Sequence, residues 1–147
     1  MAELLRLSLT CAIGLATGTA YAVPAKVGLI NTGRVVYAQH CACCHGARGE
    51  GTRGWQQRDR NGELPAPPHN AHGHTWKHSD AMLYRILQEG WRDAFNKTNR
   101  LTMPPFKGQL SPRETIAVIT YLKTLWTPKQ RQFQWEESRR EPFPAAP

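Results

Sequence analysis

The chain has 147 residues, a length that suits one domain with short attachments. Its 19 Lys and Arg residues outnumber its 11 Asp and Glu residues, which gives a formal net charge of +8. The basic residues are scattered and not clustered with aromatic residues on one helix, so we expect no nucleic acid partner and favour a protein partner with an acidic docking face. After the N-terminal segment, no apolar stretch is long enough to span a bilayer.

Residues 1–22 have the pattern of a signal peptide. Arg6 precedes an apolar run of small residues from Leu7 to Ala20, and Ala20-Tyr21-Ala22 fits an A-x-A cleavage site. Ser, Thr and Gly residues within the run make it a poor membrane-spanning helix, although an uncleaved membrane anchor is the alternative. We therefore expect export to the periplasm and a mature chain that begins near Val23.

Three helices are predicted within one domain at residues 31–127. The first runs from about Asn31 to Cys44, and the second from about Ser79, a suitable N-cap, to Glu89. The third opens with the capping box Ser111-Pro112-Arg113-Glu114 and ends at Pro128. The last two helices carry apolar faces with helical period, formed by Met82, Leu83, Ile86, Leu87, Ile116, Ile119, Leu122, Leu125 and Trp126.

The remaining segments are predicted to be irregular. Residues 46–70 and 91–110 are rich in glycine and proline, which indicates loops. Residues 23–30 are predicted to form an extended lead-in, and the charged residues 128–147 an extension outside the core. Because the sequence has no strand-like alternation of any length, the predicted fold class is all-α.

The segment Cys41-Ala42-Cys43-Cys44-His45 contains the C-x-x-C-H pattern of covalent haem attachment. Two thiols three positions apart lie on one face of a helical turn, where they can add to the two vinyl groups of a porphyrin. The next residue, His45, can then ligate the iron, and Cys43 is predicted to be a bystander thiol. A thioredoxin-like pair would need a βαβ context, and a zinc site would need a second ligand pair. We therefore expect one covalent haem c.

The mature chain contains two methionines, Met82 and Met103, that could supply a second axial ligand of the iron. Met82 belongs to the apolar face of the second helix, where a packing role is the default. Met103 lies in a loop next to two prolines, which stiffen the backbone and hold its side chain in place. A thioether also suits a low-spin electron-transfer iron, so Met103 is the predicted ligand.

From about Asn31 to Trp126 the chain resembles the class I cytochromes c. Gly33 and Tyr37 match the glycine and aromatic positions before the first haem cysteine, and Val118 and Tyr121 match their partners in the last helix. The Met-Pro-Pro-Phe segment is similar to the ligand loop of the family. The resemblance implies about three main helices wrapped around one haem, ligated by His45 and Met103. It also implies that the carbonyl group of a proline after the motif orients His45, with Pro67 as the best match and Pro68 as the alternate. His69 stands where members often have leucine.

The histidine-rich segment around His69, His72, His74 and His78 has several interpretations. It is a solvated loop, part of the core, or a second metal site for an ion such as copper. In the first case, Trp76 and His74 can donate hydrogen bonds to a haem propionate. Arg53, one of several arginines in the glycine-rich loop, is a further candidate partner for a propionate, because guanidinium forms forked pairs with carboxylate.

The predicted function is electron transfer in the periplasm, by a carrier and not an enzyme. The mechanism is outer-sphere exchange of single electrons with redox protein partners at an exposed haem edge, either as a free carrier or in association with a membrane respiratory complex. Two alternatives stay open: a haem sensor or enzyme with an open iron position, and a copper-binding module that uses the histidine-rich segment. A bacterial peroxidase of the usual kind is disfavoured because the sequence has a single C-x-x-C-H motif.

Overall fold

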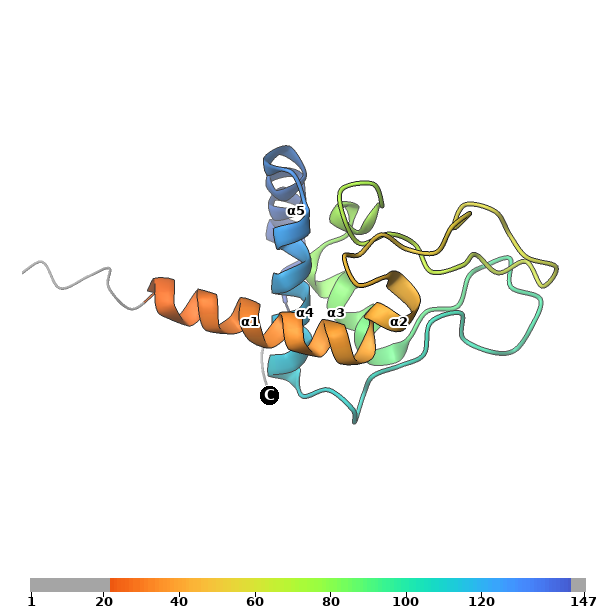
Figure 1. The fold of residues 1–147 in the computed structure, drawn as a ribbon, viewed down its shortest axis with the longest axis horizontal. Coiled ribbons are helices and arrows are strands. Elements are labelled where there is room, and N and C mark those ends of the chain that lie inside the picture. Colours follow the sequence, from red (N-terminus) through yellow and green to blue (C-terminus); the bar gives the residue numbers. More distant parts are fainter. Residues whose placement is uncertain (1–21, 144–147) are drawn as a thin grey trace, which may run out of the picture.

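The computed structural model describes residues 22–143, and this part of the chain is helical (Figure 1). The residues described contain no strand, only isolated bridges between Trp91 and Met103 and between Lys107 and Leu110. The all-α prediction is confirmed. In chain order the elements are α1 (Ala22–His40), α2 (Ala42–His45), the 3-10 helix η1 (Thr75–Lys77), α3 (Asp80–Glu89), α4 (Pro112–Leu122), the 3-10 helix η2 (Lys123–Leu125) and α5 (Pro128–Arg140).

Helix α1 begins earlier than the sequence analysis predicted. The extended lead-in at residues 23–30 is wrong, because the helix is already continuous from Ala22. Pro24 lies in its first turn, where the missing N–H group would have no intrahelical partner anyway. The predicted end at Cys44 falls in a separate turn, α2, since the regular helix stops at His40. The predicted signal peptide at residues 1–22 lies almost wholly outside the described residues.

Helices α1 and α4 cross in direct contact (Figure 1). A Cβ atom added to Gly33 would lie 2.0 Å from the carbonyl oxygen of Ala117 and 2.9 Å from the Cβ of Tyr121. The rings of Tyr37 and Tyr121 pack beside this crossing, with centroids 5.4 Å apart. The close approach that the family resemblance implied for Gly33 and Tyr37 is therefore present, and it fixes the end of α1 that leads into Cys41.

Helices α3 and α4 begin at the predicted caps. The hydroxyl group of Ser79 accepts a hydrogen bond from the backbone N–H of Met82 at 3.1 Å. Ser111 and Glu114 form the reciprocal capping box at the start of α4, where Pro112 occupies the first turn. Both predicted starts are confirmed, and the helices α3 and α4 pack against each other.

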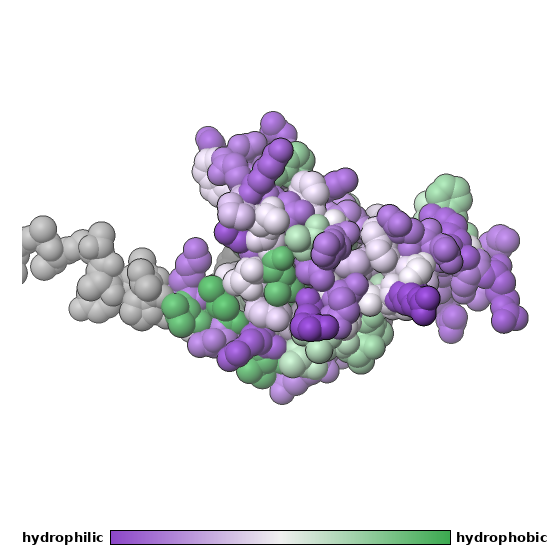
Figure 2. Space-filling view, turned by 45° about the horizontal axis from the view of Figure 1, so that its top comes forward, coloured by the Kyte–Doolittle hydropathy of each residue, from purple (hydrophilic) through white to green (hydrophobic). Residues whose placement is uncertain are grey.

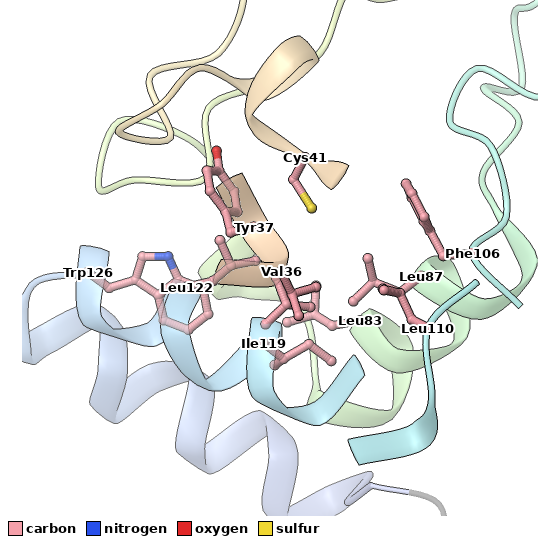
Figure 3. Close-up of a cluster of buried hydrophobic side chains, with 11 residues drawn as sticks. Val36, Tyr37, Cys41, Leu83, Leu87, Phe106, Leu110, Ile119, Leu122 and Trp126 are labelled. Atoms are coloured by element: carbon pink, nitrogen blue, oxygen red, sulfur yellow. The ribbon is translucent and has the colours of Figure 1, made fainter. Parts of the chain in front are cut away.

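A cluster of buried side chains joins α1, α3 and α4 to the loop before α4 (Figure 3). In Figure 3 the sulfur atom of Cys41 points toward the space between Tyr37 and Phe106. The cysteine that opens the haem motif is thus part of the core of the domain. The cluster consists of Val36, Tyr37, Cys41, Leu83, Leu87, Phe106, Leu110, Val118, Ile119, Leu122 and Trp126.

The sequence analysis predicted an extension outside the core at residues 128–147, but the described part of this segment, residues 128–143, contains a helix that packs on the domain. Thr127 and Gln130 form a second capping box with Pro128 at the first helical position, so this proline starts a helix. The resulting helix α5 contacts η1 and α3. Its Gln134 is 1% exposed and donates hydrogen bonds from Nε2 to Asp80 Oδ1 at 2.7 Å and to Ser138 Oγ at 2.8 Å.

The surface is mainly hydrophilic in the view of Figure 2, with a few hydrophobic patches. Val27 of α1 is 51% exposed. Across residues 22–143, none of the helices combines the length and the apolar character that crossing a membrane requires.

Candidate functional site

The helices and loops enclose a cavity of about 960 Å³ with mainly apolar walls. This volume falls within the range of cofactor sites in proteins. Cys41, Cys44, His45 and Met103, the residues predicted to hold the haem, all line it. Residues that lie more than 60 positions apart in the sequence are therefore brought to one site.

The two attachment cysteines flank the short helix α2. Cys41 is 7% exposed, and burial raises the pKa of its thiol to about 12. Cys44 is exposed to solvent, although the residue still lines the cavity. Cys43, the predicted bystander, is also exposed and lines the cavity, and its Sγ lies 3.7 Å from the Sγ of Cys44. The residues at both ends of the C-x-x-C segment thus border one cavity.

His45 is buried, and its Nδ1 lies 2.8 Å from the carbonyl oxygen of Pro67. Because a carbonyl oxygen only accepts, Nδ1 carries the proton, and Nε2 keeps a lone pair that can bind a metal. Burial lowers the pKa of this imidazole, partly offset by the hydrogen bond to Pro67. The contact expected from the family resemblance is present, and it fixes the orientation of the ring, while burial favours the neutral imidazole.

Gly51 allows the loop that carries Pro67 to approach α2. Its φ angle is +74°, and a Cβ atom at this position would lie 2.5 Å from the backbone nitrogen of Pro68. The N–H group of Gly51 donates to the carbonyl oxygen of His45 at 2.8 Å. The glycine-rich loop is thereby bonded to the backbone of His45 and packed against the segment that carries Pro67.

His69 is a site residue whose position the sequence analysis did not predict. Its ring stacks on the ring of His45, with centroids 3.9 Å apart and an interplanar angle of 28°. Its Nδ1 lies 2.8 Å from Thr75 Oγ1, and its carbonyl oxygen accepts a hydrogen bond from Trp126 Nε1 at 2.8 Å. Burial, followed by the nearby His45 and His74, holds the pKa of His69 well below its usual range. The sequence signal that could have indicated this position is that His69 stands two residues after Pro67, where family members often have leucine.

Met103 reaches the cavity from the loop between α3 and α4. Its backbone forms an antiparallel bridge with Trp91, in which each N–H group donates to the other carbonyl oxygen at 2.9 Å. Gly90, with a φ angle of +79°, lies so close that an added Cβ atom would be 2.7 Å from the carbonyl oxygen of Met103. Met82 of α3 also lines the cavity. The two methionines differ in that Met103 is held by backbone contacts in a loop, whereas Met82 belongs to a helix face.

The structure does not bring Trp76 or Arg53 to the cavity. The indole N–H of Trp76 donates to the carbonyl oxygen of Gly73 at 3.0 Å, and its ring packs edge-on against Phe133 of α5 at 5.4 Å. The side chain of Trp76 therefore packs against helix α5, an element that was not predicted from the sequence. Arg53 is exposed in the glycine-rich loop and is not among the residues that line the cavity.

The histidine-rich segment is divided by η1. His69, His74 and His78 line the cavity, whereas His72 is exposed. Within residues 22–143, no group of three or more His, Cys, Asp or Glu residues is arranged to hold a metal ion. The copper alternative therefore has no set of ligands to support it in that part of the chain.

A family model described as Cytochrome c matches residues 30–126. The chain belongs to the cytochrome c family. Cytochromes of this family are haem proteins of electron transfer, and this cytochrome carries one covalently attached haem c. The fold of the cytochrome is similar to that of a solved structure, cytochrome CL from the marine methylotrophic bacterium Methylophaga aminisulfidivorans MPT, with a TM-score of 0.51 and 16% identity over 95% of this chain and 89% of that one. The comparison with curated proteins gives no match.

The donor set of the cavity fits a covalent haem. Thiols at Cys41 and Cys44 can form thioethers, the free Nε2 of His45 suits iron, and the thioether of Met103 is a soft ligand. The apolar walls suit the porphyrin faces and keep the effective dielectric constant low. When bound, the haem supplies reversible one-electron chemistry at its iron.

Proposed function

We propose that this cytochrome carries single electrons in the periplasm, with its haem attached at Cys41 and Cys44 and its iron ligated by His45 and Met103. The observation that carries the proposal is that these four side chains line one apolar cavity. Met103 is preferred over Met82 because its bridge to Trp91 fixes the backbone of the ligand loop. A ligand held in this way stays in place when the charge of the iron changes, which favours fast electron exchange.

The protein environment supports a carrier more than an enzyme. The hydrogen bond from His45 to Pro67 and the stacked ring of His69 restrain the imidazole. Buried apolar side chains such as Leu87 and Ile119 line the cavity and exclude water. Restrained ligands and a dry cavity keep the reorganisation small, and a methionine ligand raises the reduction potential.

The loop at residues 91–101 is the proposed docking surface for redox partners. It exposes three apolar side chains, Trp91 at 46%, Phe95 at 67% and Leu101 at 42%, and Trp91 is bridged to Met103. Its single acidic residue, Asp93, is paired with Arg58 at 2.7 Å. An apolar centre with a basic rim suits a redox protein with an acidic docking face, whether that partner is soluble or part of a membrane respiratory complex. The exposed basic residues of the loop are Arg92, Lys97 and Arg100.

The test is expression of the full chain with a haem-maturation system, followed by mass spectrometry and visible spectra of both oxidation states. We expect the mass of one added haem, cleavage near Val23 and the weak far-red charge-transfer band of methionine ligation in the ferric protein. A polypeptide without added haem would contradict the proposal.

Two matched variants separate the methionines. Met103→Leu is expected to lose the far-red band and to bind carbon monoxide in the reduced state, whereas Met82→Leu is expected to keep the band. The reverse pattern would assign the ligand to Met82. Ready binding of carbon monoxide by the unaltered ferrous protein would instead favour a sensor or enzyme with an open iron position.

A further inference from the structure

We propose that His74 and His78 hold the haem propionates through hydrogen bonds from their imidazole N–H groups. The inference rests on the proposed function only in that the haem must fill the cavity described above. It concerns the end of the porphyrin that the attachment motif does not reach, because the two propionates of a haem lie on the opposite edge from its two vinyl groups.

The cavity offers few basic side chains as partners for these carboxylates. Among the described residues that line it there is no arginine and no lysine. The basic groups are five histidines, and two of them are engaged at the iron side: His45 with Pro67, and His69 with Thr75 and the ring of His45. His40 directly precedes the attachment cysteine Cys41, at the vinyl edge. His74 and His78 remain.

These two imidazoles flank η1 and form a small aromatic group with Trp55. The ring of His74 stacks on Trp55 with centroids 5.8 Å apart, and it meets the ring of His78 edge-on at 5.4 Å. All three side chains line the cavity and are partly buried. In the hydrogen bonds of residues 22–143, His74 and His78 take part through their backbone groups alone, so the imidazole N–H groups are available to a ligand.

The surroundings of the pair favour neutral imidazoles that donate from one nitrogen. Burial is the main cause that lowers the pKa of His74 and of His78, and the charge of Lys77 on η1 adds to it for both. On the other elements, His69 also borders His74, and Gln134 of α5 donates to the carbonyl oxygen of His78 at 3.3 Å.

Two carboxylates line the cavity as well, and both already have partners. Asp93 is paired with Arg58 at 2.7 Å, and Glu63 accepts a hydrogen bond from Thr98 at 3.2 Å. Within residues 22–143, neither carboxylate forms a hydrogen bond with His74 or His78. The donors of the pair and the acceptors of the haem are complementary.

The test compares two double variants of the holoprotein, His74→Gln with His78→Gln and His74→Leu with His78→Leu. Both remove the imidazoles and their own titration, but the glutamine pair keeps N–H donors. The readout is the reduction potential as a function of pH. Ferric iron stabilises an ionised propionate, so the potential falls with pH through the range in which the propionates lose their protons. Loss of hydrogen bonds to the charged form raises the propionate pKa and moves this range upward.

We expect the leucine pair to titrate about one pH unit above the glutamine pair, a roughly tenfold change in proton affinity. Equal titration of the two pairs would overturn the proposal, since it would show that donors at these positions do not matter. The exposed His72 provides the control, and its glutamine and leucine variants are expected to titrate alike.

Failure of this inference is distinguishable from failure of the proposed function. Equal titration in variants that retain the haem and the far-red band would reject the propionate role and leave the carrier function intact. Loss of the far-red band in the unaltered protein would reject ligation by Met103, while the comparison of the two pairs still decides the propionate role. If the leucine pair is not matured, the same comparison with single leucine and glutamine variants of each histidine decides it.

Discussion

Gly28 and Gly33 both lie in helix α1 but have opposite surroundings, so their substitutions can be compared directly. Gly33 touches the backbone of α4, whereas a Cβ atom at Gly28 would have nothing within 4 Å. We expect Gly33→Ala to lower the free energy of unfolding of the holoprotein by about 2–3 kcal/mol, because the helices must move apart. Gly28→Ala is expected to raise it by up to about 1 kcal/mol. Urea unfolding of both variants measures the difference, and equal effects would contradict the close contact.

The ring of His69 offers a second test at the scale of one residue. His69→Leu removes the stacking on His45 and the contact with Thr75. We expect the haem to be retained, the ferric electron paramagnetic resonance spectrum to change because the axial imidazole is free to rotate, and the free energy of unfolding to fall by about 1 kcal/mol. His72→Leu is the control. An unchanged ferric spectrum in His69→Leu would show that Pro67 alone orients His45.

The attachment motif was predicted from spacing along the chain. The structure places its residues Cys41, Cys44 and His45 at one cavity, because neighbouring positions on a helical turn point in related directions. The contact between His45 and Pro67 followed from the family resemblance and not from periodicity. The stacked position of His69 could not be predicted, because the direction of a ring in a loop depends on distant partners such as Trp126.

At the scale of elements, helices with a strong apolar face were predicted well. The starts of α3 and α4 are marked by caps, and their faces carry a regular stripe. Helix α5 was missed because it is strongly polar and docks largely through hydrogen bonds, as Gln134 shows. Pro128 is also an ambiguous signal, because a proline can follow the end of one helix or occupy the first position of the next. The capping residues Thr127 and Gln130 were the signal that could have found it.

The docking of α5 can be tested at its buried glutamine. Gln134→Ala removes the hydrogen bonds to Asp80 and Ser138, and we expect it to lower the free energy of unfolding by about 1–3 kcal/mol. Gln132→Ala, an exposed position on the same helix, is expected to change it by less than about 0.5 kcal/mol. Thermal and urea unfolding measure both. Similar effects of the two substitutions would show that α5 contributes no specific docking.

The pairing of Asp93 with Arg58 makes the stability of the loop at residues 91–101 depend on pH. Hydrogen bonds from Arg58 and from the N–H of Phe95 hold the pKa of Asp93 below its usual range. The contribution is therefore present above the unfolded-state pKa of about 3.9 and is lost as the pH falls through the lower folded-state value. We expect Asp93→Asn to be less stable than the unaltered protein at pH 7 and equally stable in acid below both values, as urea unfolding at each pH can measure. A constant difference would contradict the ion pair.

At the scale of the whole molecule, the net charge of +8 should govern encounters with small redox reagents. We expect oxidation by an anionic reagent such as ferricyanide to slow several-fold as salt is raised from low to physiological ionic strength, because screening removes the attraction. Oxidation by a cationic cobalt complex is expected to accelerate under the same conditions. Stopped-flow rates measure both, and parallel salt dependences would contradict a basic docking surface.

The composition and motifs of the chain were enough to predict a helical domain built around one haem. They did not predict how far the domain extends, since α1 reaches back to Ala22 and α5 continues to Arg140. Both additions lack the apolar periodicity on which the prediction depended. They also lie outside the attachment motif and ligand loop, so errors in these elements did not affect the assignment of the cofactor.

The bridge between Trp91 and Met103 closes the intervening residues into a loop whose base is clamped at the end of α3. Insertions or replacements at the exposed residues of this loop can therefore change the outer surface of the protein without moving the backbone of Met103. Partner preference can then diverge during evolution while the proposed ligand of the iron stays in place.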